Sequence, residues 1–443
     1  MKKFIAAVLT LVMLISAVSV SLCASAEGTT DYTIVNPYET VDWDTWDYYK
    51  ANLHTHSVAS DGEETITDMV ELYYQQGYDI LAMTDHGVIN KGWNKERETN
   101  GVFNYFRECE PMSQEDYDRV TNCTDRNGRG MVDITGGIEC NMAVFTKTHV
   151  NGFFTEYGQG EWGIENDYRT APAQIEKLGG YSVLNHVGDW VNSNNYPERS
   201  HWPVYIQYFA NIFNDYHSCL GMEIVNSRDV VTKADRALWD ELLQVVIPTG
   251  RNIWGFSNDD SELASEVGRC FEYFMLPENT AENVKTAMKD GTFFACSIYE
   301  KKIDGTEDTE GNGNVPLVKN IIVDQEENTI ELVLDETRDC SEIKWIADGE
   351  VISNSLKIDL NDYEDKIGCY VRFQLKGEGG ITYSQAFEVQ YEGREDKEIP
   401  EQPEFLQSEA GQTFLKYYRT VPFAIVQFVV EKIGNLFRDL FNK

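Results

Sequence analysis

Residues 52–62 read Asn-Leu-His-Thr-His-Ser-Val-Ala-Ser-Asp-Gly, so that two histidines two positions apart follow a short apolar run. Side chains alternate between the two faces of a strand, and both imidazoles should therefore point the same way. Similar apolar runs end in Thr-Asp-His at residues 79–86 and in Asn-His at residues 181–186. Five of the seven histidines lie beside such runs. Because a barrel carries its chemistry at strand ends, the pattern predicts a polynuclear metal site there.

Short apolar runs alternate with amphipathic stretches over residues 48–300, and residues 65–76 show the apolar spacing of a helix. Alternating strands and helices are typical of a parallel sheet with crossover connections. So many units within roughly 250 residues favour a closed or nearly closed barrel. Residues 90–131 interrupt the alternation with a long polar stretch. We interpret them as an insertion over the site, because long irregular stretches are usually functional.

The C-terminal part of the chain has a different pattern. Residues 315–395 contain short strand-like runs separated by turn residues, which predicts a small β-sandwich. Residues 396–412 are acidic, contain two prolines and are expected to be a linker. Residues 413–443 carry apolar side chains at helical spacing and are mostly basic where charged, as in an amphipathic helix on an anionic membrane surface. A helix packed on the protein itself explains the same pattern, so both interpretations stay open.

The first 26 residues have the form of an export signal, with a basic start, an apolar core and small residues before the expected cleavage after Ala26. They predict a secreted or cell-surface protein. The remaining residues comprise 35 basic and 74 acidic side chains, a formal charge of −39. Such a chain repels phosphate backbones, so binding to a nucleic-acid duplex is not expected. The oligomeric state is unknown from the sequence.

Eight cysteines remain after the signal is removed. An even number in an exported protein permits disulfides, although a sequence does not give their pairing. Cys109 with Cys123 and Cys340 with Cys369 are candidate pairs, and buried free thiols are the alternative.

The motifs around the histidines resemble those of a known family. Residues 52–62 and 78–86 look like the first two motifs of the PHP (polymerase and histidinol phosphatase) family. Its later motifs resemble, in order, residues 137–139, 149, 185–186 and 259–260, and residues 291–297 resemble the segment that closes such domains. The resemblance covers about residues 48–300. It implies an α/β fold, a distorted (β/α)7 TIM-like barrel, which the small β-sandwich and the C-terminal amphipathic helix would follow.

Carried over position by position, the resemblance also implies a ligand set. One divalent cation would be held by His54, His56, Glu139 and Asp260, a second by Glu139, His149 and His186, and a third by Asp61 and His86. The mixture of imidazoles and carboxylates suits Mn²⁺, Zn²⁺ or Fe²⁺. The family usually ends its last motif with Asp-x-His, whereas Glu262 stands in that histidine's place, and Asp259 offers another register for Asp260. Glu262 would favour a harder ion such as Mn²⁺, and the departure puts the third cation in question.

Three further residues are candidates for roles in the reaction. Glu223, at a strand end, would orient a ligand histidine, unless it is paired elsewhere in the barrel. Asp85 would orient His86 or contact water. Arg228, just after a strand, would clamp a phosphate through two hydrogen bonds, and a plain surface arginine is the alternative.

The leading hypothesis is an exported phosphoesterase that hydrolyses a phosphate mono- or diester by a hydroxide bridging two of its two or three divalent cations. Bound cations would let so acidic a protein take a small phosphorylated substrate. One alternative is a metal-dependent hydrolase of the amidohydrolase type, which uses the same hydroxide on an amide or ester. Another is a non-catalytic cell-surface binding protein with a relict metal site.

Overall fold

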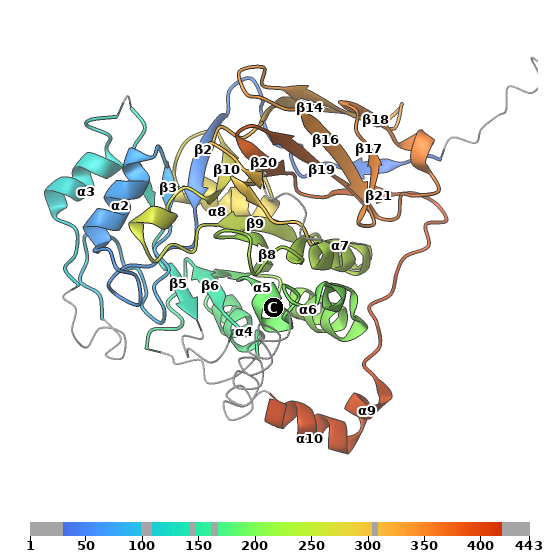
Figure 1. The fold of residues 1–443 in the computed structure, drawn as a ribbon, viewed down its shortest axis with the longest axis horizontal. Coiled ribbons are helices and arrows are strands. Elements are labelled where there is room, and N and C mark those ends of the chain that lie inside the picture. Colours follow the sequence, from blue (N-terminus) through green and yellow to red (C-terminus); the bar gives the residue numbers. More distant parts are fainter. Residues whose placement is uncertain are drawn as a thin grey trace, which may run out of the picture.

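The structure is a computed structural model, and it describes residues 30–98, 109–126, 128–140, 147–160, 167–303 and 309–418. The expected signal at residues 1–26 lies outside the described residues, as does the segment from residue 419 onward, which is most of the expected amphipathic helix. Strands and helices are mixed throughout the described chain, which is therefore an α/β protein (Figure 1).

Strands and helices alternate in the first two thirds of the chain, as the sequence predicts. The strands are β2 (Asp47–Asn52), β3 (Ile80–Leu81), β4 (Val132–Asp133), β5 (Ile138–Cys140), β6 (Val150–Phe153), β7 (Tyr181–Leu184), β8 (Cys219–Asn226), β9 (Trp254–Asn258), β10 (Cys270–Leu276) and β11 (Phe293–Ser297). The helices are α2 (Ile66–Gln75), α3 (Gln114–Thr121), α4 (Thr170–Lys177), α5 (Val187–Val191), α6 (Pro203–Asp215), α7 (Asp235–Val246) and α8 (Ala281–Asp290), with short 3-10 turns at Pro197–His201, Ile247–Thr249 and Ala264–Glu266. Helix α2 begins where the hydroxyl of Thr65 accepts the backbone N–H of Asp68, an N-cap that its sequence provides.

Two sheets contain these strands. The five-stranded sheet has the order β5-β6-β7-β8-β9, in which β6 is antiparallel to both neighbours and β7, β8 and β9 run parallel. Strands β2, β3 and β4 run parallel in an eleven-stranded sheet, with β10 and β11 continuing antiparallel on the other side of β2. Isolated bridges from Thr55 to Ser261 and from His86 to Glu139 connect the two sheets. The described strands thus form no continuous closed barrel, and the expected TIM-like barrel is not confirmed.

The last third of the described chain is almost entirely β-structure. Its strands are β12 (Tyr299–Glu300), β13 (Thr309–Glu310), β14 (Val318–Asp324), β15 (Thr329–Leu334), β16 (Glu342–Ala347), β17 (Glu350–Ser353), β18 (Lys357–Asp359), β19 (Tyr370–Gly377), β20 (Gly380–Tyr383) and β21 (Phe387–Gln390), with a 3-10 turn at Leu360–Tyr363. Strands β14, β15 and β18 form their own sheet. Strand β20, however, pairs with β11, so the large sheet runs without a break from the α/β part into the all-β part. The expected separate β-sandwich is therefore not confirmed.

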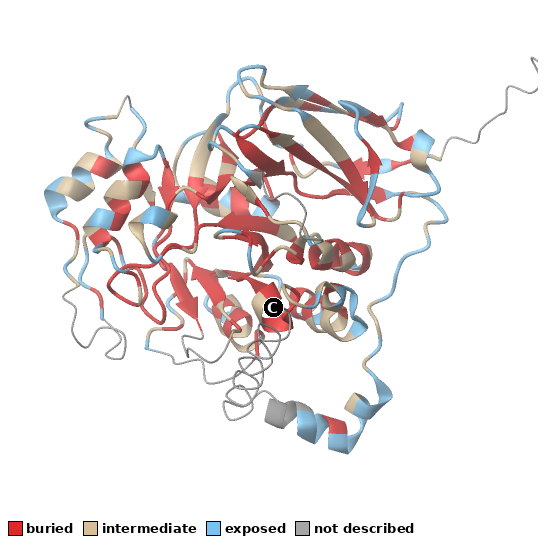
Figure 2. Cartoon of the chain, in the orientation of Figure 1, coloured by how far each residue is buried: buried red, intermediate tan, exposed pale blue. Residues whose placement is uncertain are grey.

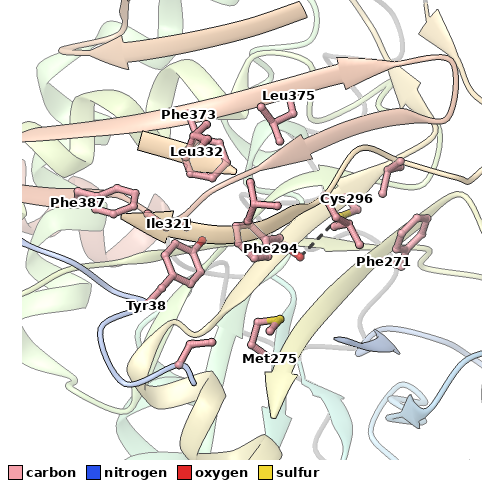
Figure 3. Packing of buried hydrophobic residues seen from close by; sticks show 14 of the residues in the cluster. Tyr38, Phe271, Met275, Phe294, Cys296, Ile321, Leu332, Phe373, Leu375 and Phe387 are labelled. Atoms are coloured by element: carbon pink, nitrogen blue, oxygen red, sulfur yellow. Dashed lines mark hydrogen bonds between the residues drawn. The ribbon is translucent and has the colours of Figure 1, made fainter. Parts of the chain in front are cut away.

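One hydrophobic core extends across this junction. The ring of Tyr38 stacks on Phe294 of β11 at a centroid distance of 4.6 Å, and Phe373 and Phe387 of the all-β part lie beside them (Figure 3). Strands β19 and β20 are buried almost throughout, while helices such as α2 and α8 expose their outer faces (Figure 2). The chain before β2 contributes β1 (Thr33–Val35), which pairs with β21. Packing and sheet pairing thus tie the two parts into one body.

The described cysteines are all free thiols. The candidate pair Cys109–Cys123 does not form, and the thiol of Cys123 instead donates to the carbonyl of Arg126. The candidate pair Cys340–Cys369 is also wrong, because Cys369 is buried against α7, where its Sγ lies 3.5 Å from the carbonyl oxygen of Leu243. Within the described residues, no helix has the length and apolarity needed to cross a bilayer.

A buried ion pair joins β19 to α7 across the junction. The Nε and Nη2 atoms of Arg372 donate to the carboxylate of Asp240 at 2.7 and 2.6 Å, and the hydroxyl of Tyr370 donates to it at 2.7 Å. Only 3 % of Arg372 and 5 % of Asp240 are exposed. Each buried charge is therefore compensated by the other charge and not by water.

Replacing Asp240 with alanine should destabilise the fold, because the guanidinium of Arg372 would remain buried without its partner. We expect the free energy of unfolding to fall by about 3–5 kcal/mol, measured by urea denaturation. The control is Glu241→Ala, which removes a partly exposed contact with His201 and should cost at most about 1 kcal/mol. Equal losses in the two variants would contradict the role of the buried pair.

Candidate metal centre

The candidate ligands gather at one edge of the two sheets. His54 and His56 follow β2, His86 follows β3, and His186 follows β7, all strands of the parallel sets. Asp260 follows β9, and Glu139 lies within β5. His149 precedes its strand, but β6 runs antiparallel, so its start lies at the edge where its neighbours end. The topology thus brings together side chains that are more than 200 residues apart.

Glu139 lies at the centre of this cluster and is almost completely buried. Its carboxylate oxygens lie near five imidazoles, at 3.4 Å from His54 Nε2, 3.3 Å from His56 Nε2, 3.1 Å from His86 Nδ1, 3.2 Å from His149 Nδ1 and 3.6 Å from His186 Nε2. The amide of Asn185 donates to Glu139 Oε1 at 2.7 Å and fixes the orientation of the carboxylate. A single buried carboxylate is thus shared by all the histidines of the site.

Three groups of side chains within this cluster could each hold a cation, with ligand atoms within 4.8 Å of one another. The groups are His54, His56, Glu139 and Asp260; His56, Asp61 and His86; and His86, Glu139 and His149. The first group has the composition that the resemblance implies. The second contains the implied pair of Asp61 and His86 and adds His56. In the third group, His86 stands where the resemblance implies His186. His186 lies nearer to the first group, with its Nε2 at 3.9 Å from Asp260 Oδ2.

Several buried atoms of the cluster make no well-aligned hydrogen bond to the described residues, although polar atoms lie close to some of them. They are His54 Nε2, Glu139 Oε2, His149 Nε2 and His186 Nδ1. Buried polar atoms are normally hydrogen-bonded, so four such atoms in one cluster need an explanation. Imidazole nitrogens and carboxylate oxygens are the donors that Zn²⁺ and similar divalent ions bind. The residues present therefore fit divalent cations.

Glu223 of strand β8 contacts two of the candidate ligands through its carboxylate. Its Oε1 lies 2.8 Å from His54 Nδ1, and its Oε2 accepts the backbone N–H of His186 at 2.9 Å. With Nδ1 engaged in this way, the Nε2 atom of His54 is the one that faces Glu139 and Asp260, as in many metal sites where a carboxylate orients a ligand histidine. The amide of Asn226 donates both to Glu223 and to Asp260 Oδ2, at 2.9 and 3.1 Å. Asn226 and Asn185 were missed by the sequence reasoning.

The structure separates the two adjacent aspartates. Asp259 is buried away from the histidines, where its carboxylate accepts backbone N–H groups of Gly268, Arg269 and Cys270 at 2.7–2.8 Å. Asp260 Oδ1 lies 3.0 Å from His54 Nε2 and 3.2 Å from His56 Nε2. Asp260 is therefore the aspartate of the candidate centre.

Two predicted site residues lie outside the cation groups, although Glu262 is near enough for Asp61, His56 and Asp260 to affect the pKa of its carboxyl, which burial raises. Glu262 and Arg228 are both exposed, and neither belongs to the three cation groups found among the described residues. Glu262 uses its backbone, whose carbonyl accepts the N–H of Glu63 at 2.8 Å. Asp85 is completely buried but also lies outside the three groups, because its carboxylate binds Ser57, Ser60 and Arg97.

Unusual backbone conformations occur at two candidate ligands. His186 has φ of 28° and Asp260 has φ of 49°, the left-handed region that non-glycine residues rarely adopt. Such conformations cluster at functional sites, where the surrounding contacts hold them. Gly62 shows a related constraint, since a Cβ atom there would lie 2.7 Å from the backbone carbon of His56. Only glycine lets the loop of residues 57–62 fold back so closely.

The charges of the cluster balance one another. Burial lowers the pKa of His56, but Asp61, Asp260 and Glu139 outweigh burial and raise it to about 10. Burial likewise lowers the pKa of His186, and Glu139 and Asp260 raise it to about 9. Burial raises the pKa of Asp260, yet the neighbouring imidazoles hold it well below its usual range. Burial lowers the pKa of His149, which the nearby Glu139 only partly offsets. Without a cation, the cluster therefore keeps protons on His56 and His186 and negative charge on Asp260.

Comparisons with known proteins bear on this site. A family model described as the PHP domain matches residues 52–248, which include every histidine of the cluster together with Asp61 and Glu139. No curated protein matches the chain. Several solved structures are similar to the chain, at low identity and low TM-score.

The first solved structure is a two-domain protein from Bacteroides vulgatus ATCC 8482 that contains a predicted PHP-like metal-dependent phosphoesterase (15 % identity, 78 % of this chain and 96 % of that chain, TM-score 0.41). The second is PsfC from Pseudomonas syringae PB-5123 (14 % identity, 54 % and 88 %, TM-score 0.31). The third is the lesion-specific endonuclease PfuEndoQ from Pyrococcus furiosus (14 % identity, 55 % and 56 %, TM-score 0.33). The family match thus identifies a PHP domain over residues 52–248 of the chain.

Proposed function

We propose that the chain hydrolyses the phosphate mono- or diester of a small substrate with two or three bound divalent cations, Mn²⁺, Zn²⁺ or Fe²⁺. The observation that carries the proposal is the cluster around Glu139, where buried imidazole and carboxylate atoms lie together without well-aligned hydrogen bonds to the described residues. Bound cations would polarise a phosphate, neutralise its charge and make water acidic enough to act as a nucleophile near neutral pH. An isolated phosphate would otherwise be repelled by a chain with a formal charge of −37.

The protein's own residues would prepare this chemistry by orientation. Glu139 would be shared between cation groups, Glu223 would fix the ring of His54, and Asn226 would hold Asp260. We interpret the two sheets, joined by bridges at Thr55 and His86, as a distorted barrel that is open between them. This interpretation is supported by the shared edge at which the strands of both sheets end.

We also propose that the chain is exported and that its C-terminal segment binds an anionic lipid surface. Export rests on the form of residues 1–26. The second proposal is supported by five basic against two acidic residues over 412–443 and by the described helices α9 (Glu404–Gln407) and α10 (Glu409–Tyr418). The rings of Phe405 and Phe414 on these helices contact each other and are 58 % and 43 % exposed. Basic charge next to exposed aromatic rings suits an anionic bilayer surface.

The mature chain should therefore sediment with phosphatidylglycerol vesicles at low salt and remain in solution with phosphatidylcholine vesicles. A chain that ends at residue 403 should bind neither, because it lacks the basic segment and both aromatic rings. Equal sedimentation of the full and shortened chains would contradict the lipid proposal.

The raised pKa values of His56 and His186 predict how metal and pH act together. Their folded pKa values of about 10 and 9 exceed the unfolded value of about 6.5. The stability that their protonation contributes is therefore fully present below about pH 6.5 and is lost as pH rises towards 9–10. In the presence of a chelator, the Tm should fall between about pH 7 and pH 9.

Cation binding requires neutral imidazoles, so adding Mn²⁺ to the metal-free protein at about pH 7.5 should release protons. An indicator dye in weak buffer measures this release, and saturating Mn²⁺ should also reduce the pH dependence of the Tm. A Tm that varies with pH equally with and without Mn²⁺, or metal uptake without proton release, would show that these histidines are not ligands.

Hydrolysis is tested with an aryl phosphate monoester and a bis-aryl phosphate diester in the presence of Mn²⁺. His54→Ala should lose activity by at least about 100-fold, since residues that merely orient a ligand already affect metal sites about 10–100-fold. Glu223→Gln should fall within that smaller range. The control is His217→Ala, an exposed histidine outside the cluster, which should keep full activity. A folded His54→Ala variant with undiminished hydrolysis would overturn the proposed function.

A further inference from the structure

A buried ion pair lies directly beside the candidate centre. Arg97, from the segment expected to be an insertion, donates from Nη1 to Asp85 Oδ2 at 2.7 Å. Neither side chain is exposed to solvent. Burying two charges in this way is costly unless both are well hydrogen-bonded, so the pair needs a reason to be at this position.

The carboxylate of Asp85 is saturated by four donor groups. It accepts the backbone N–H of Ser57 at 2.7 Å, the hydroxyls of Ser57 and Ser60 at 2.9 Å, and the guanidinium of Arg97. A carboxylate offers about four lone-pair positions, so Asp85 has none left for a cation. Asp85 is thus explained as a holder of the loop of residues 57–62 rather than as a catalytic residue.

The loop held by Asp85 carries part of one cation group. Ser60 Oγ lies 3.1 Å from Asp61 Oδ1 and 3.3 Å from His56 Nδ1. His86, the third member of the group, directly follows Asp85 in the chain. Asp61 belongs to this group alone, whereas His56 and His86 each also belong to another group. A displacement of Asp85 and of its loop would therefore weaken the group of His56, Asp61 and His86 most.

The other side of Arg97 is anchored to the sheet. Its Nη2 donates to Asn90 Oδ1 at 2.8 Å, and the amide of Asn90 donates to Asp133 of β4 at 2.8 Å. Asp133 also accepts the backbone N–H of Trp93 at 2.7 Å. The guanidinium therefore connects a fixed strand to Asp85 through a chain of short hydrogen bonds.

We propose that Arg97 is a positioning residue which, through Asp85, holds the loop of residues 57–62 and with it Asp61 in place for the cation bound by His56, Asp61 and His86. The inference rests on the proposed function, since it assumes that this group takes a cation. It assigns the dependence to one group: the group of His54, His56, Glu139 and Asp260 has its own support in Glu223 and Asn226.

The test measures metal rather than activity. Wild type and Arg97→Met are titrated with Mn²⁺ by calorimetry, and bound metal is counted by elemental analysis after dialysis. We expect Arg97→Met to weaken one class of sites by about 10–100-fold, with the loss of one ion per chain at limiting Mn²⁺ and the tighter sites unchanged. A purely structural role would lower the Tm without changing the affinity of one site selectively.

Two further variants complete the experiment. Ser60→Ala removes one of the donors that bind the loop to Asp85 while leaving the ion pair intact, and it should weaken the same ion even if Arg97→Met does not fold. The control is Arg126→Met, from the same insertion, whose guanidinium contacts Asp79 at 3.2 Å away from the cluster and which should bind Mn²⁺ like wild type.

The possible failures are distinguishable. Wild type that binds no Mn²⁺, Zn²⁺ or Fe²⁺ would overturn the proposed function itself. Wild type that binds metal, with unchanged stoichiometry and affinity in both folded Arg97→Met and Ser60→Ala, would overturn the positioning role alone. Equal weakening of every site in Arg97→Met would also contradict it, because the proposal confines the effect to one ion.

Discussion

The burial of one carboxylate governs the design of this site. Glu139 is almost inaccessible to water and lies within hydrogen-bonding range of imidazoles from several strands. An isolated buried carboxylate would lose its charge, but the surrounding imidazoles outweigh its burial and hold its pKa well below the usual range. The charge must in turn be compensated by protons or by cations. The same constraint therefore explains both the clustering of histidines and the capacity of the site for metal.

The two sheets meet at that carboxylate. The bridge between His86 and Glu139 connects the sheet of β2–β4 to that of β5–β9, and the bridge between Thr55 and Ser261 connects them on the other side. The residues of both bridges are candidate ligands or direct neighbours of candidate ligands, so the site lies where the two sheets join. The remaining strands of the large sheet continue through β11 and β20 into the all-β part, so that part supports β2 from outside. The sheet that carries His54 and His56 is thus held on both of its sides.

Local patterns in the sequence predict much of this arrangement. The spacing of apolar residues that predicts helix α2 is a property of neighbouring residues. Two histidines two positions apart in a strand also point the same way, whichever strands pair with it. The pairing of a strand with its neighbours in the sheet is not a local property, because the partner strands can be far away along the chain. The pairing of β20 with β11, and hence the absence of a separate sandwich, leaves no mark in either segment. Helix α6, by contrast, has a pattern of its own, since its buried residues Ile206, Phe209, Ala210 and Phe213 are spaced as on one face of a helix.

The carboxylates near the site show which part of the chemistry a sequence reveals. Asp85, Asp259 and Asp260 follow apolar strands, and Glu223 lies within strand β8, where the sequence predicts a strand end. Their roles differ through the donors around them: backbone N–H groups and a tyrosine occupy Asp259, while serines and an arginine saturate Asp85. Only Asp260 keeps an oxygen directed at two ligand imidazoles. Function in this cluster is therefore assigned by the lone pairs that the fold leaves unused, and those are counted only once every neighbour is in place.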